Sequence, residues 1–318
     1  MNWAFIGAGA IARSVAKRVI GGAHALKAVY SRTCRKAEGL AEKYGATAYS
    51  SVEDAVKRND VDAAYVCVTN NAHCEIAERV LACGKPVLLE KPFAVNESQA
   101  EKLFAEAERK GVYLCEAMWT QFNRPAIEMK KLFESGKLGK VKKAEMSFCL
   151  PIAFSKNNRI LKSSLAGGAL LDLGVYPLSF ACRLFGYPEN ITARARFKYG
   201  VDIQDDIELF YDGFRVEIKT SVQSFRSVGE RMKIVCEGGT VTSGAYHSGG
   251  GFTVKTPQGK TVVKGEKNAM LVQFGNVAAE IESGAKQSRF VPPSATFETM
   301  RLLDSVRSLI NLKFPFET

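Results

Sequence analysis

The chain has 318 residues, of which 46% are hydrophobic and 24% charged, as in a soluble globular protein with room for about two domains. No apolar run approaches the roughly 18–20 residues that cross a bilayer, and the N-terminus lacks the basic and apolar stretches of a signal peptide. We therefore expect a cytoplasmic protein with no membrane partner. The net charge is +11, but the basic residues are scattered without a run of five or more. This pattern favours an anionic cofactor or substrate over nucleic acid.

Cysteine and histidine usage bears on redox chemistry and metals. The chain has eight cysteines and three histidines. It contains no C-x-x-C pair, no H-E-x-x-H motif and no mixed Cys/His cluster. We therefore expect reduced thiols and no metal site.

Short apolar runs alternate with helical patterns in the first third of the chain. This alternation is typical of βαβ units in a doubly wound parallel sheet. We predict a first α/β domain over residues 1–118. Its predicted strands are residues 3–6, 26–30, 63–68, 86–89 and 113–115, and its predicted helices are residues 11–20, 34–44, 52–58, 73–82 and 97–110.

After residue 118 strands follow one another with short turns, which indicates a large, mainly antiparallel sheet. We predict an α+β domain over residues 119–318 for substrate binding and oligomerisation. Helices would cover one face of its sheet, and strands such as 215–221 would leave apolar side chains on the other, which predicts a homodimer or homotetramer formed through this face. The predicted strands are 141–148, 191–199, 206–211, 215–221, 231–236, 252–256 and 260–263, and the predicted helices are 126–134, 168–185, 269–283 and 295–309.

A G-x-G-x-x-A motif follows the first predicted strand and opens the first helix. It comprises Gly7, Gly9, Ala10, Ile11 and Ala12. The first glycine allows a tight turn, the second lets backbone approach a pyrophosphate, and the small last residue lets helix and strand pack closely. The helix N-terminus supplies N–H donors to the phosphates. This context favours a dinucleotide site over a purely structural turn.

The end of the second predicted strand bears on the choice of cofactor. An NAD site usually has a carboxylate there for the ribose 2′-hydroxyl, but this chain has Ser31 and Arg32, followed by Lys36. These side chains can bind a 2′-phosphate. We therefore predict NADP, with NAD the less favoured alternative.

Two further segments contain polar residues that suit a catalytic site. Glu90 and Lys91 follow a strand end and precede a proline, although a surface lysine would give the same pattern. Asp172 and Tyr176 stand four apart in an apolar helical stretch, which places them on one helical face. A helix cap and a core tyrosine would explain that pair equally well.

Together these motifs resemble the glucose-fructose oxidoreductase / inositol dehydrogenase (Gfo/Idh/MocA) family, in order and in approximate spacing over essentially the whole chain. The chain is most similar to the branch of dimeric dihydrodiol dehydrogenases and NADP-dependent D-xylose dehydrogenases. This likeness rests on Glu-Ala-Met-Trp-Thr-Gln-Phe at 116–122, on Tyr176 and on the ending Phe314-Pro315. That branch typically has arginine where this chain has Gln121, which leaves the substrate open. The stretch 150–165 also differs from the branch.

The resemblance implies roles for individual residues. Lys91 would be the active-site lysine, beside a Lys91–Pro92 bond that can be cis. Tyr176 would be the general acid/base, and Asp172 would orient the substrate or the lysine. The residues that would lie against the cofactor are Thr69, Asn70, His73, Glu90 and Lys91, and those that would line the substrate pocket are Trp119, Gln121 and Phe148.

These roles suggest reversible hydride transfer between a nicotinamide and a carbinol carbon of a sugar or another vicinal diol. Because an ordinary tyrosine keeps its proton at neutral pH, a nearby ammonium such as that of Lys91 is needed to favour the phenolate. The sequence leaves three alternatives open: an NADPH-dependent keto-sugar reductase, an NAD-dependent inositol dehydrogenase, and a non-catalytic dinucleotide-sensing regulator.

Overall fold

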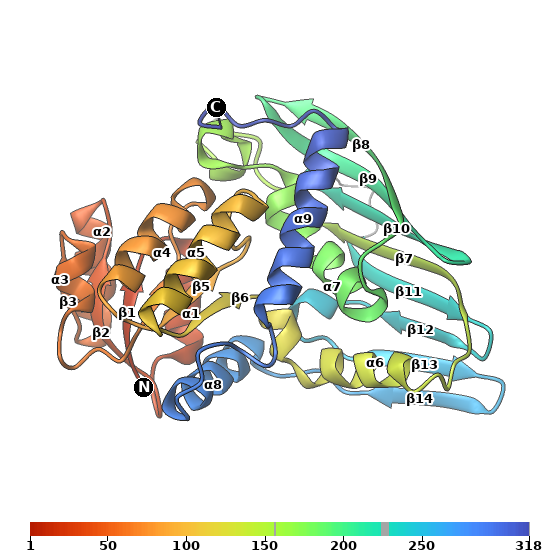
Figure 1. Cartoon of the computed structure of the whole chain (residues 1–318), viewed down its shortest axis with the longest axis horizontal. Helices are drawn as coiled ribbons and strands as arrows, with labels where there is room; N and C mark the ends of the chain where they lie inside the picture. Colours follow the sequence, from red (N-terminus) through yellow and green to blue (C-terminus); the bar gives the residue numbers. More distant parts are fainter. Residues whose placement is uncertain (156, 224–228, 318) are drawn as a thin grey trace. The chain divides into compact units, whose positions relative to one another are not determined.

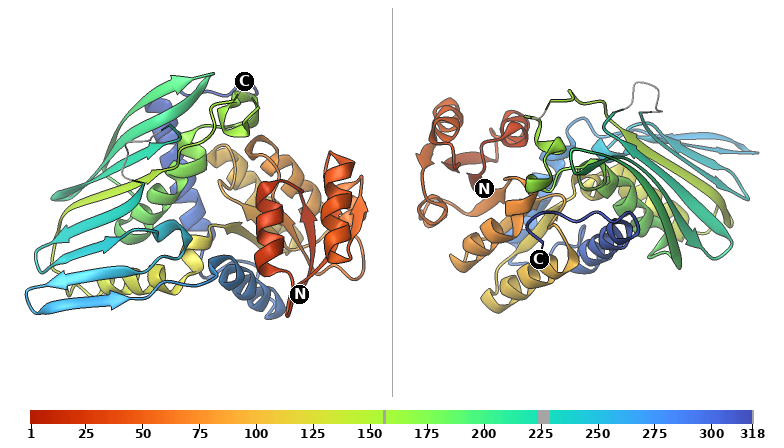
Figure 2. Two further views of the ribbon diagram at one scale, coloured as in Figure 1. Left: turned by 180° about the vertical axis from the view of Figure 1, so that it is seen from behind. Right: turned by 90° about the horizontal axis from the view of Figure 1, so that it is seen from above.

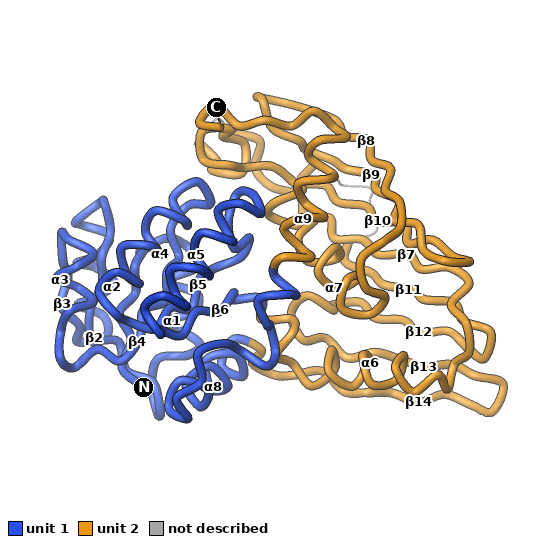
Figure 3. The backbone as a smooth tube through the Cα atoms, in the orientation of Figure 1, with its two compact units in different colours: residues 1–118, 270–296 blue, residues 119–269, 297–318 orange. Residues whose placement is uncertain are grey.

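The computed structural model describes residues 1–155, 157–223 and 229–317. The chain divides into two compact units, shown in Figure 3. Unit 1 comprises residues 1–118 and 270–296, and unit 2 comprises residues 119–269 and 297–318. The sequence analysis assigned residues 270–296 to the second domain, and for this segment the assignment is wrong.

A parallel sheet with strand order β3-β2-β1-β4-β5-β6 forms the centre of unit 1 (Figure 1). The order runs outward from β1 in both directions, so the predicted doubly wound Rossmann arrangement is confirmed. The sequence analysis missed β3, because three partly exposed residues give no clear alternation. The strands are β1 (Asn2–Ile6), β2 (Ala25–Tyr30), β3 (Thr47–Tyr49), β4 (Ala63–Val66), β5 (Val87–Glu90) and β6 (Leu114–Ala117).

Cap residues set the ends of several helices in unit 1. The Ser51 hydroxyl, at the start of α3, and the Asn96 amide oxygen, at the start of α5, each accept a backbone N–H from the first turn, which satisfies a donor that lacks an intrahelical partner. Helices α2 and α5 end at Gly45 and Gly111 in the left-handed conformation, where glycine carries no steric cost. The helices are α1 (Ala10–Val19), α2 (Cys34–Tyr44), α3 (Val52–Val56), α4 (His73–Ala82) and α5 (Glu97–Lys110).

Helix α8 (Ala269–Glu282) explains why residues 270–296 belong to unit 1. The ring of Phe274 packs edge-on against Trp3 and Tyr65, with centroid distances of 4.8 and 5.2 Å. The Tyr113 hydroxyl donates a 2.7 Å hydrogen bond to the Glu280 carboxylate. An aromatic cluster and a buried polar pair therefore join this late segment to the N-terminal sheet.

Unit 2 contains the second predicted sheet, with strand order β14-β13-β12-β11-β7-β10-β9-β8. Strands β7 and β10 pair in parallel and the other neighbours pair antiparallel, which confirms a mainly antiparallel sheet. The sequence analysis missed the short strand β12. The strands are β7 (Val141–Cys149), β8 (Asn190–Lys198), β9 (Val201–Tyr211), β10 (Phe214–Ser221), β11 (Glu230–Cys236), β12 (Thr240–Ser243), β13 (Phe252–Thr256) and β14 (Gly259–Val263).

The outer face of this sheet is charged, which corrects the predicted apolar face. Along β10, Val216 and Ile218 are buried, whereas Glu217 and Lys219 line a hollow of about 1390 Å³ on the outer face. Buried apolar and outward-facing charged side chains thus alternate along β10, as in any half-buried strand. The apolar side of β10 faces α7. Figure 2, viewed from behind, shows no helix in front of the outer face.

Helices α6 (Arg124–Glu134), α7 (Val175–Phe185) and α9 (Pro293–Leu309) complete the described fold. One π-helical turn, Leu170–Gly174, precedes α7. It interrupts the single helix predicted over 168–185, so the i, i+4 argument for one shared face does not apply to Asp172 and Tyr176. The buried Asp202 carboxylate accepts the Leu170 N–H at 2.6 Å and caps this turn.

The helical stretch Ser163–Phe185 is long and apolar enough to cross a membrane, whereas the sequence analysis expected no apolar stretch of that length. Its most apolar window is 89% buried inside the protein. This burial is what the core helix of a soluble protein shows as well.

Candidate functional site

The glycine loop lies between β1 and α1. Gly7 has a φ of +132°, and a Cβ atom there would approach the carbonyl oxygen of Cys67 to 2.5 Å, so the end of β1 can meet the end of β4 only through glycine. A Cβ atom on Gly9 would have no neighbour within 4 Å among the described atoms. The loop is thus closed on the protein side and open on the outer side, as a phosphate cradle requires.

Helix α1 begins directly after this loop, and no side chain caps it. Its first turn, which includes Ala10, Ile11 and Ala12, contains no acidic residue. The N-terminal amides and the positive end of the helix dipole are therefore not neutralised by a side chain, which suits an anionic ligand. Ala12 is fully buried and lets the helix pack closely on the sheet.

Basic residues gather beyond the end of β2. Arg32 and Lys36 are exposed, and Ser31 is partly exposed. A cleft of about 240 Å³ beside them is lined by Arg13 from α1 and by Arg35, Lys36 and Lys43 from α2. The predicted pair of Arg32 and Lys36 therefore belongs to a larger basic region, of which the sequence analysis missed Arg13 and Lys43.

The segment after β4 carries Thr69, Asn70 and His73. The Thr69 hydroxyl donates to the Asn71 side chain at 2.8 Å, and Asn70 and His73 are buried. The two ring nitrogens of His73 lie 2.8 Å from the Pro92 carbonyl and 3.3 Å from the Val68 carbonyl. The imidazole therefore ties the end of β4 to the turn after β5, and its ring nitrogens already face main-chain carbonyls.

That turn holds Glu90 and Lys91, and the Lys91–Pro92 bond is cis. Glu90 accepts a 2.5 Å hydrogen bond from the Tyr65 hydroxyl. Nearby, Glu116 of β6 is buried and accepts a 3.1 Å hydrogen bond from Thr296. Burial raises the pKa of Glu116 to about 7, and the negative charge of Glu90 adds to this, although the Lys91 ammonium acts in the opposite direction. The lysine thus lies in the field of two carboxyl groups.

Tyr176 of α7 stands in an aromatic cluster of unit 2. Trp119 donates its indole N–H to the Tyr176 hydroxyl at 3.2 Å. The Tyr176 ring meets Phe148 and His247 edge-on, with centroids 5.5 and 5.1 Å away. Three of the predicted residues, Tyr176, Trp119 and Phe148, therefore come together around one hydroxyl group.

Asp172 has a different partner. Its buried carboxylate forms a two-pronged ion pair with Arg159, at 2.7 and 3.2 Å. Arg159 comes from the 150–165 stretch, which the sequence analysis could not assign. Gln121, predicted to line the pocket, is 4% exposed, and its amide donates to the Ser179 hydroxyl at 3.0 Å within unit 2.

Two residues of the cluster were missed altogether. His247 packs on Phe148 at 4.4 Å and on Trp119 at 5.6 Å between ring centroids. Glu230 of β11 holds the His247 ring through a 2.6 Å contact to Nδ1. The only sequence signal for them was the scarcity of histidine.

Comparison with known proteins identifies the family. Residues 1–117 match the model of the Gfo/Idh/MocA oxidoreductases with an NAD-binding Rossmann fold, and residues 126–242 match the C-terminal domain model of the same family. Trans-1,2-dihydrobenzene-1,2-diol dehydrogenase of Mus musculus is 30% identical over 99% of this chain and 98% of the mouse protein. The chain belongs to the Gfo/Idh/MocA family. The predicted resemblance is therefore confirmed, and the protein is an oxidoreductase that acts on CH–OH groups.

Other Gfo/Idh/MocA relatives extend this picture. The NADP-dependent scyllo-inositol 2-dehydrogenase IolU of Bacillus subtilis is 29% identical over 91% of this chain and 90% of its own length. Two solved structures share the fold. A 3-ketoreductase of Actinomadura kijaniata, in complex with NADP, has a TM-score of 0.87 at 21% identity, with 98% of each chain covered. An aldose-aldose oxidoreductase of Caulobacter crescentus has a TM-score of 0.86 at 23% identity, covering 98% and 97% of the two chains.

The residues of this Gfo/Idh/MocA member fit a dinucleotide. The open side of Gly9 and the uncapped start of α1 suit a pyrophosphate, and Ser31 with Arg32 suits the ribose end. Within the described residues, no group of three or more His, Cys, Asp and Glu side chains could hold a metal ion.

Proposed function

We propose that the protein is an NADP-dependent oxidoreductase acting on a sugar or another vicinal diol. When bound, the nicotinamide supplies the hydride chemistry. The observation that carries the proposal is the Tyr176 hydroxyl, which receives a hydrogen bond from Trp119 inside an aromatic cluster. An aromatic wall beside one proton-carrying oxygen suits a polyhydroxylated ring. The curated relatives named as diol and inositol dehydrogenases support this substrate class.

The proposed choice of NADP rests on the basic region after β2. No carboxylate follows Tyr30, and Ser31, Arg32 and Lys36 offer a hydroxyl and two cations to a 2′-phosphate. Arg13 and Arg35 line the neighbouring cleft and add to the positive field. NAD is the less favoured cofactor, because no carboxylate stands at this strand end to accept from a ribose 2′-hydroxyl.

In the proposed mechanism Tyr176 takes the proton from the substrate hydroxyl during oxidation and returns it during reduction. The Trp119 N–H stabilises the phenolate form of Tyr176 that accepts this proton. Lys91 contributes positive charge near the reacting oxygen, as the family resemblance implies. Because Asp172 is paired with Arg159, we propose that it orients the substrate by holding the arginine.

A substrate panel tests this function. Aldoses, inositols, vicinal diols and the matching keto sugars are assayed with NADP, NAD and their reduced forms, and the absorbance of the reduced nicotinamide is followed. We expect turnover of at least one polyol with NADP. Turnover only from the ketone side would favour the keto-sugar reductase, an NAD-only inositol activity would favour the inositol dehydrogenase, and cofactor binding without any turnover would favour the sensing regulator.

Two variants test the proton-transfer step. Tyr176→Phe and Lys91→Met should each lower kcat by ~10²–10⁴, the usual contribution of a positioned acid or base. The double variant should be little worse than the worse single variant, because groups acting as a unit are not additive. Cofactor affinity and melting temperature are measured on the same proteins, and full turnover in Tyr176→Phe would contradict the mechanism.

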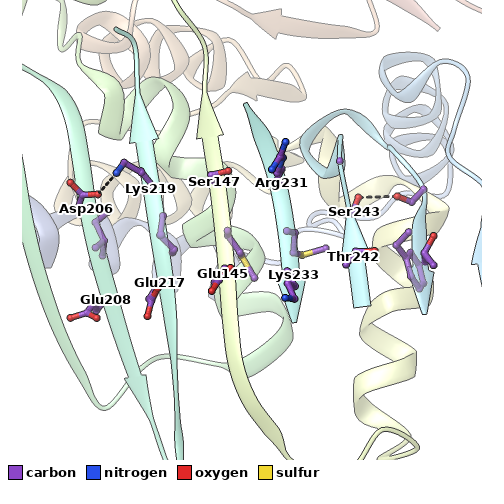
Figure 4. A pocket seen from close by; sticks show the side chains of 18 of the residues that line it. Glu145, Ser147, Asp206, Glu208, Glu217, Lys219, Arg231, Lys233, Thr242 and Ser243 are labelled. Carbon is purple, nitrogen blue, oxygen red and sulfur yellow. Dashed lines mark hydrogen bonds and ion pairs between the residues drawn. The ribbon is translucent and has the colours of Figure 1, made fainter. Parts of the chain in front are cut away.

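We also propose that two copies pair through the outer face of the unit 2 sheet. The sequence analysis based this pairing on exposed apolar area, whereas the structure supports it through charged side chains on this face. Figure 4 shows Glu208, Glu217 and Glu145 on adjacent strands, with Lys233 on the next. Within one copy these glutamates pair with Lys143 and Arg215, so β7 and β10 carry both signs of charge. In a two-fold pairing the row of glutamates of one copy can meet Lys233 of the other. Light scattering at micromolar concentration tests this, and Lys233→Glu should weaken a dimer.

For the cell compartment we propose the cytoplasm, because the eight cysteines are free in the structure and suit a reducing environment.

A further inference from the structure

The ring of His247 completes the aromatic cluster around Tyr176. His247 lies in a single 3-10 turn, Tyr246–Ser248, between β12 and β13. Its imidazole centroid is 4.4 Å from Phe148, 5.1 Å from Tyr176 and 5.6 Å from Trp119. The ring therefore touches every member of the cluster that holds the proposed catalytic hydroxyl.

Three contacts fix His247, two through its main chain and one through its ring. The Glu230 carboxylate accepts from the His247 main-chain N–H at 2.5 Å and lies 2.6 Å from ring atom Nδ1. The Thr120 hydroxyl donates to the His247 carbonyl at 2.6 Å. A ring held in this way keeps one orientation, as a group that recognises a ligand must.

The second ring nitrogen is available. A carboxylate at Nδ1 keeps a proton on that atom, so in the neutral ring Nε2 is an acceptor, and in the charged ring it is a donor. Among the described residues, Nε2 has no hydrogen-bond partner, and the His247 side chain keeps 21% of its surface exposed. The Trp119 N–H is already used by Tyr176, and Phe148 has no polar atom. Besides the Tyr176 hydroxyl, which the proposed mechanism uses for the reacting oxygen, His247 Nε2 is therefore a polar atom of this cluster that can bind a ligand.

We propose that His247 Nε2 binds the hydroxyl next to the reacting carbinol and so selects vicinal diols over simple alcohols. The proposal rests on the proposed function, since it takes Tyr176 as the group that meets the reacting hydroxyl. In a vicinal diol the second oxygen is one carbon–carbon bond away from the first. A ring packed beside Tyr176 is well placed for that second oxygen. Glu230 is a positioning residue, which acts by holding the imidazole.

Two substitutions of His247 distinguish the roles of its two ring nitrogens, Nδ1 and Nε2. In His247→Asn the amide nitrogen can take the place of Nδ1 and keep the bond to Glu230, but nothing replaces Nε2. In His247→Gln the amide nitrogen can reach the place of Nε2, but the bond to Glu230 is lost. Glu230→Gln keeps the imidazole and removes the charge that fixes it. His247→Phe keeps the ring packing and serves as a further control if the smaller side chains destabilise the fold.

The probes are trans-cyclohexane-1,2-diol and cyclohexanol, which differ by one hydroxyl, assayed with the full-length enzyme and NADP. We expect the wild type to prefer the diol. His247→Asn and His247→Phe should lower kcat/KM for the diol about tenfold more than for cyclohexanol, because a site built around a hydroxyl loses that contact alone. His247→Gln should keep most of the preference, and Glu230→Gln should lie between. An unchanged ratio in His247→Asn, or an equal loss on both probes, overturns the proposal.

A binding measurement keeps this test separate from that of the function. The chain has three histidines, and His24 and His73 are 5% and 1% exposed, so the His247 ring signal can be followed by NMR and identified by its absence in His247→Gln. The diol is titrated into NADP-loaded Tyr176→Phe. Suppose that the His247 signal shifts in Tyr176→Phe but that the wild-type enzyme turns over no substrate. The proposed function would then be wrong, while the diol site would stand. No shift at saturating diol overturns the His247 proposal whatever the turnover.

Discussion

The indole N–H of Trp119 donates a 3.2 Å hydrogen bond to the hydroxyl oxygen of Tyr176. Trp119 opens unit 2, and Tyr176 lies in the first turn of α7. A donor directed at a phenolic oxygen favours the form of the tyrosine that has lost its proton, because the hydrogen bond to an ionised oxygen is the stronger one. The pocket wall predicted from the sequence is thus also a partner of the proposed acid/base.

Replacing Trp119 by phenylalanine tests this relationship. Trp119→Phe keeps an aromatic wall and removes the N–H donor. We expect kcat to fall about tenfold, as for loss of a hydrogen bond to a charged group, with NADPH affinity nearly unchanged. Steady-state kinetics and cofactor fluorescence titration measure both quantities. An unchanged kcat with an intact melting temperature would show that the hydrogen bond does not contribute to turnover.

Arg32→Ala tests the cofactor proposal. Loss of a charge-assisted contact to a 2′-phosphate should raise KM for NADP by about tenfold or more and leave KM for NAD nearly the same. Lys17→Ala removes an exposed cation from the other end of α1 and is the matched control. An equal rise with both cofactors would exclude a role for Arg32 in recognising the phosphate.

Glu116 should make the stability of the protein depend on pH. Burial raises its pKa from the ordinary 4.5 to about 7, so between these pH values the unfolded state has released a proton that the folded state still holds. The free energy of unfolding should therefore fall as pH rises through this window, by roughly 3 kcal/mol. Urea unfolding of Glu116→Gln at pH 5 and pH 8 should give a flatter profile. Glu108→Gln, which changes an exposed glutamate of α5, should keep the wild-type profile.

Asp202 and Asp205 form a buried acidic pair next to the π-helical turn that precedes α7. Asp205 accepts from the Thr220 hydroxyl at 2.7 Å, and burial together with the charge of Asp202 raises the pKa of Asp205 well above its usual value. The folded pair thus retains a proton that the unfolded chain releases, and it loses stability as pH rises.

Asp205→Asn removes the need for that proton, because its amide can donate to Asp202 and its oxygen can still accept from Thr220. We expect a higher melting temperature than the wild type at pH 8 and a similar one at pH 5. Asp212→Asn, in the exposed turn between β9 and β10, is the control. A variant that is less stable than the wild type at pH 8 would exclude the shared proton.

Local patterns predicted the elements that carry strong local signals. Short apolar runs located most strands of both sheets. The spacing of Gly7 and Gly9 marked the loop, and at Gly7 only glycine permits the close approach of Cys67. The short strands β3 and β12 were missed because three or four residues contain too little periodicity. The π-helical turn at Leu170–Gly174 was missed because its apolar sequence resembles that of an ordinary helix, and the Leu170 N–H at its start is bound by Asp202, which lies far along the chain.

The site was predicted less completely than the fold. Tyr176, Trp119 and Phe148 were found through the family resemblance. His247 and Arg159 were not, because each meets its partner only through tertiary packing. The bond from the Gln121 amide to Ser179 was not predicted either, because it too forms through tertiary packing. The outer face of the sheet was misjudged although the alternation in Arg215–Ser221 was readable, because the apolar residues were counted without assigning them to a face.

The placement of α8 on β1 and β4 has a consequence for synthesis on the ribosome. When Met118 has been added, the first unit still lacks the ring of Phe274, and Trp3, Phe5 and Tyr65 lack the aromatic neighbour that packs on them in the finished protein. Nearly the whole of the second unit must be made before that ring emerges. The N-terminal part of the nascent chain must therefore wait with an incomplete core, and a fragment ending at Met118 should bind chaperones or aggregate where the full chain does not.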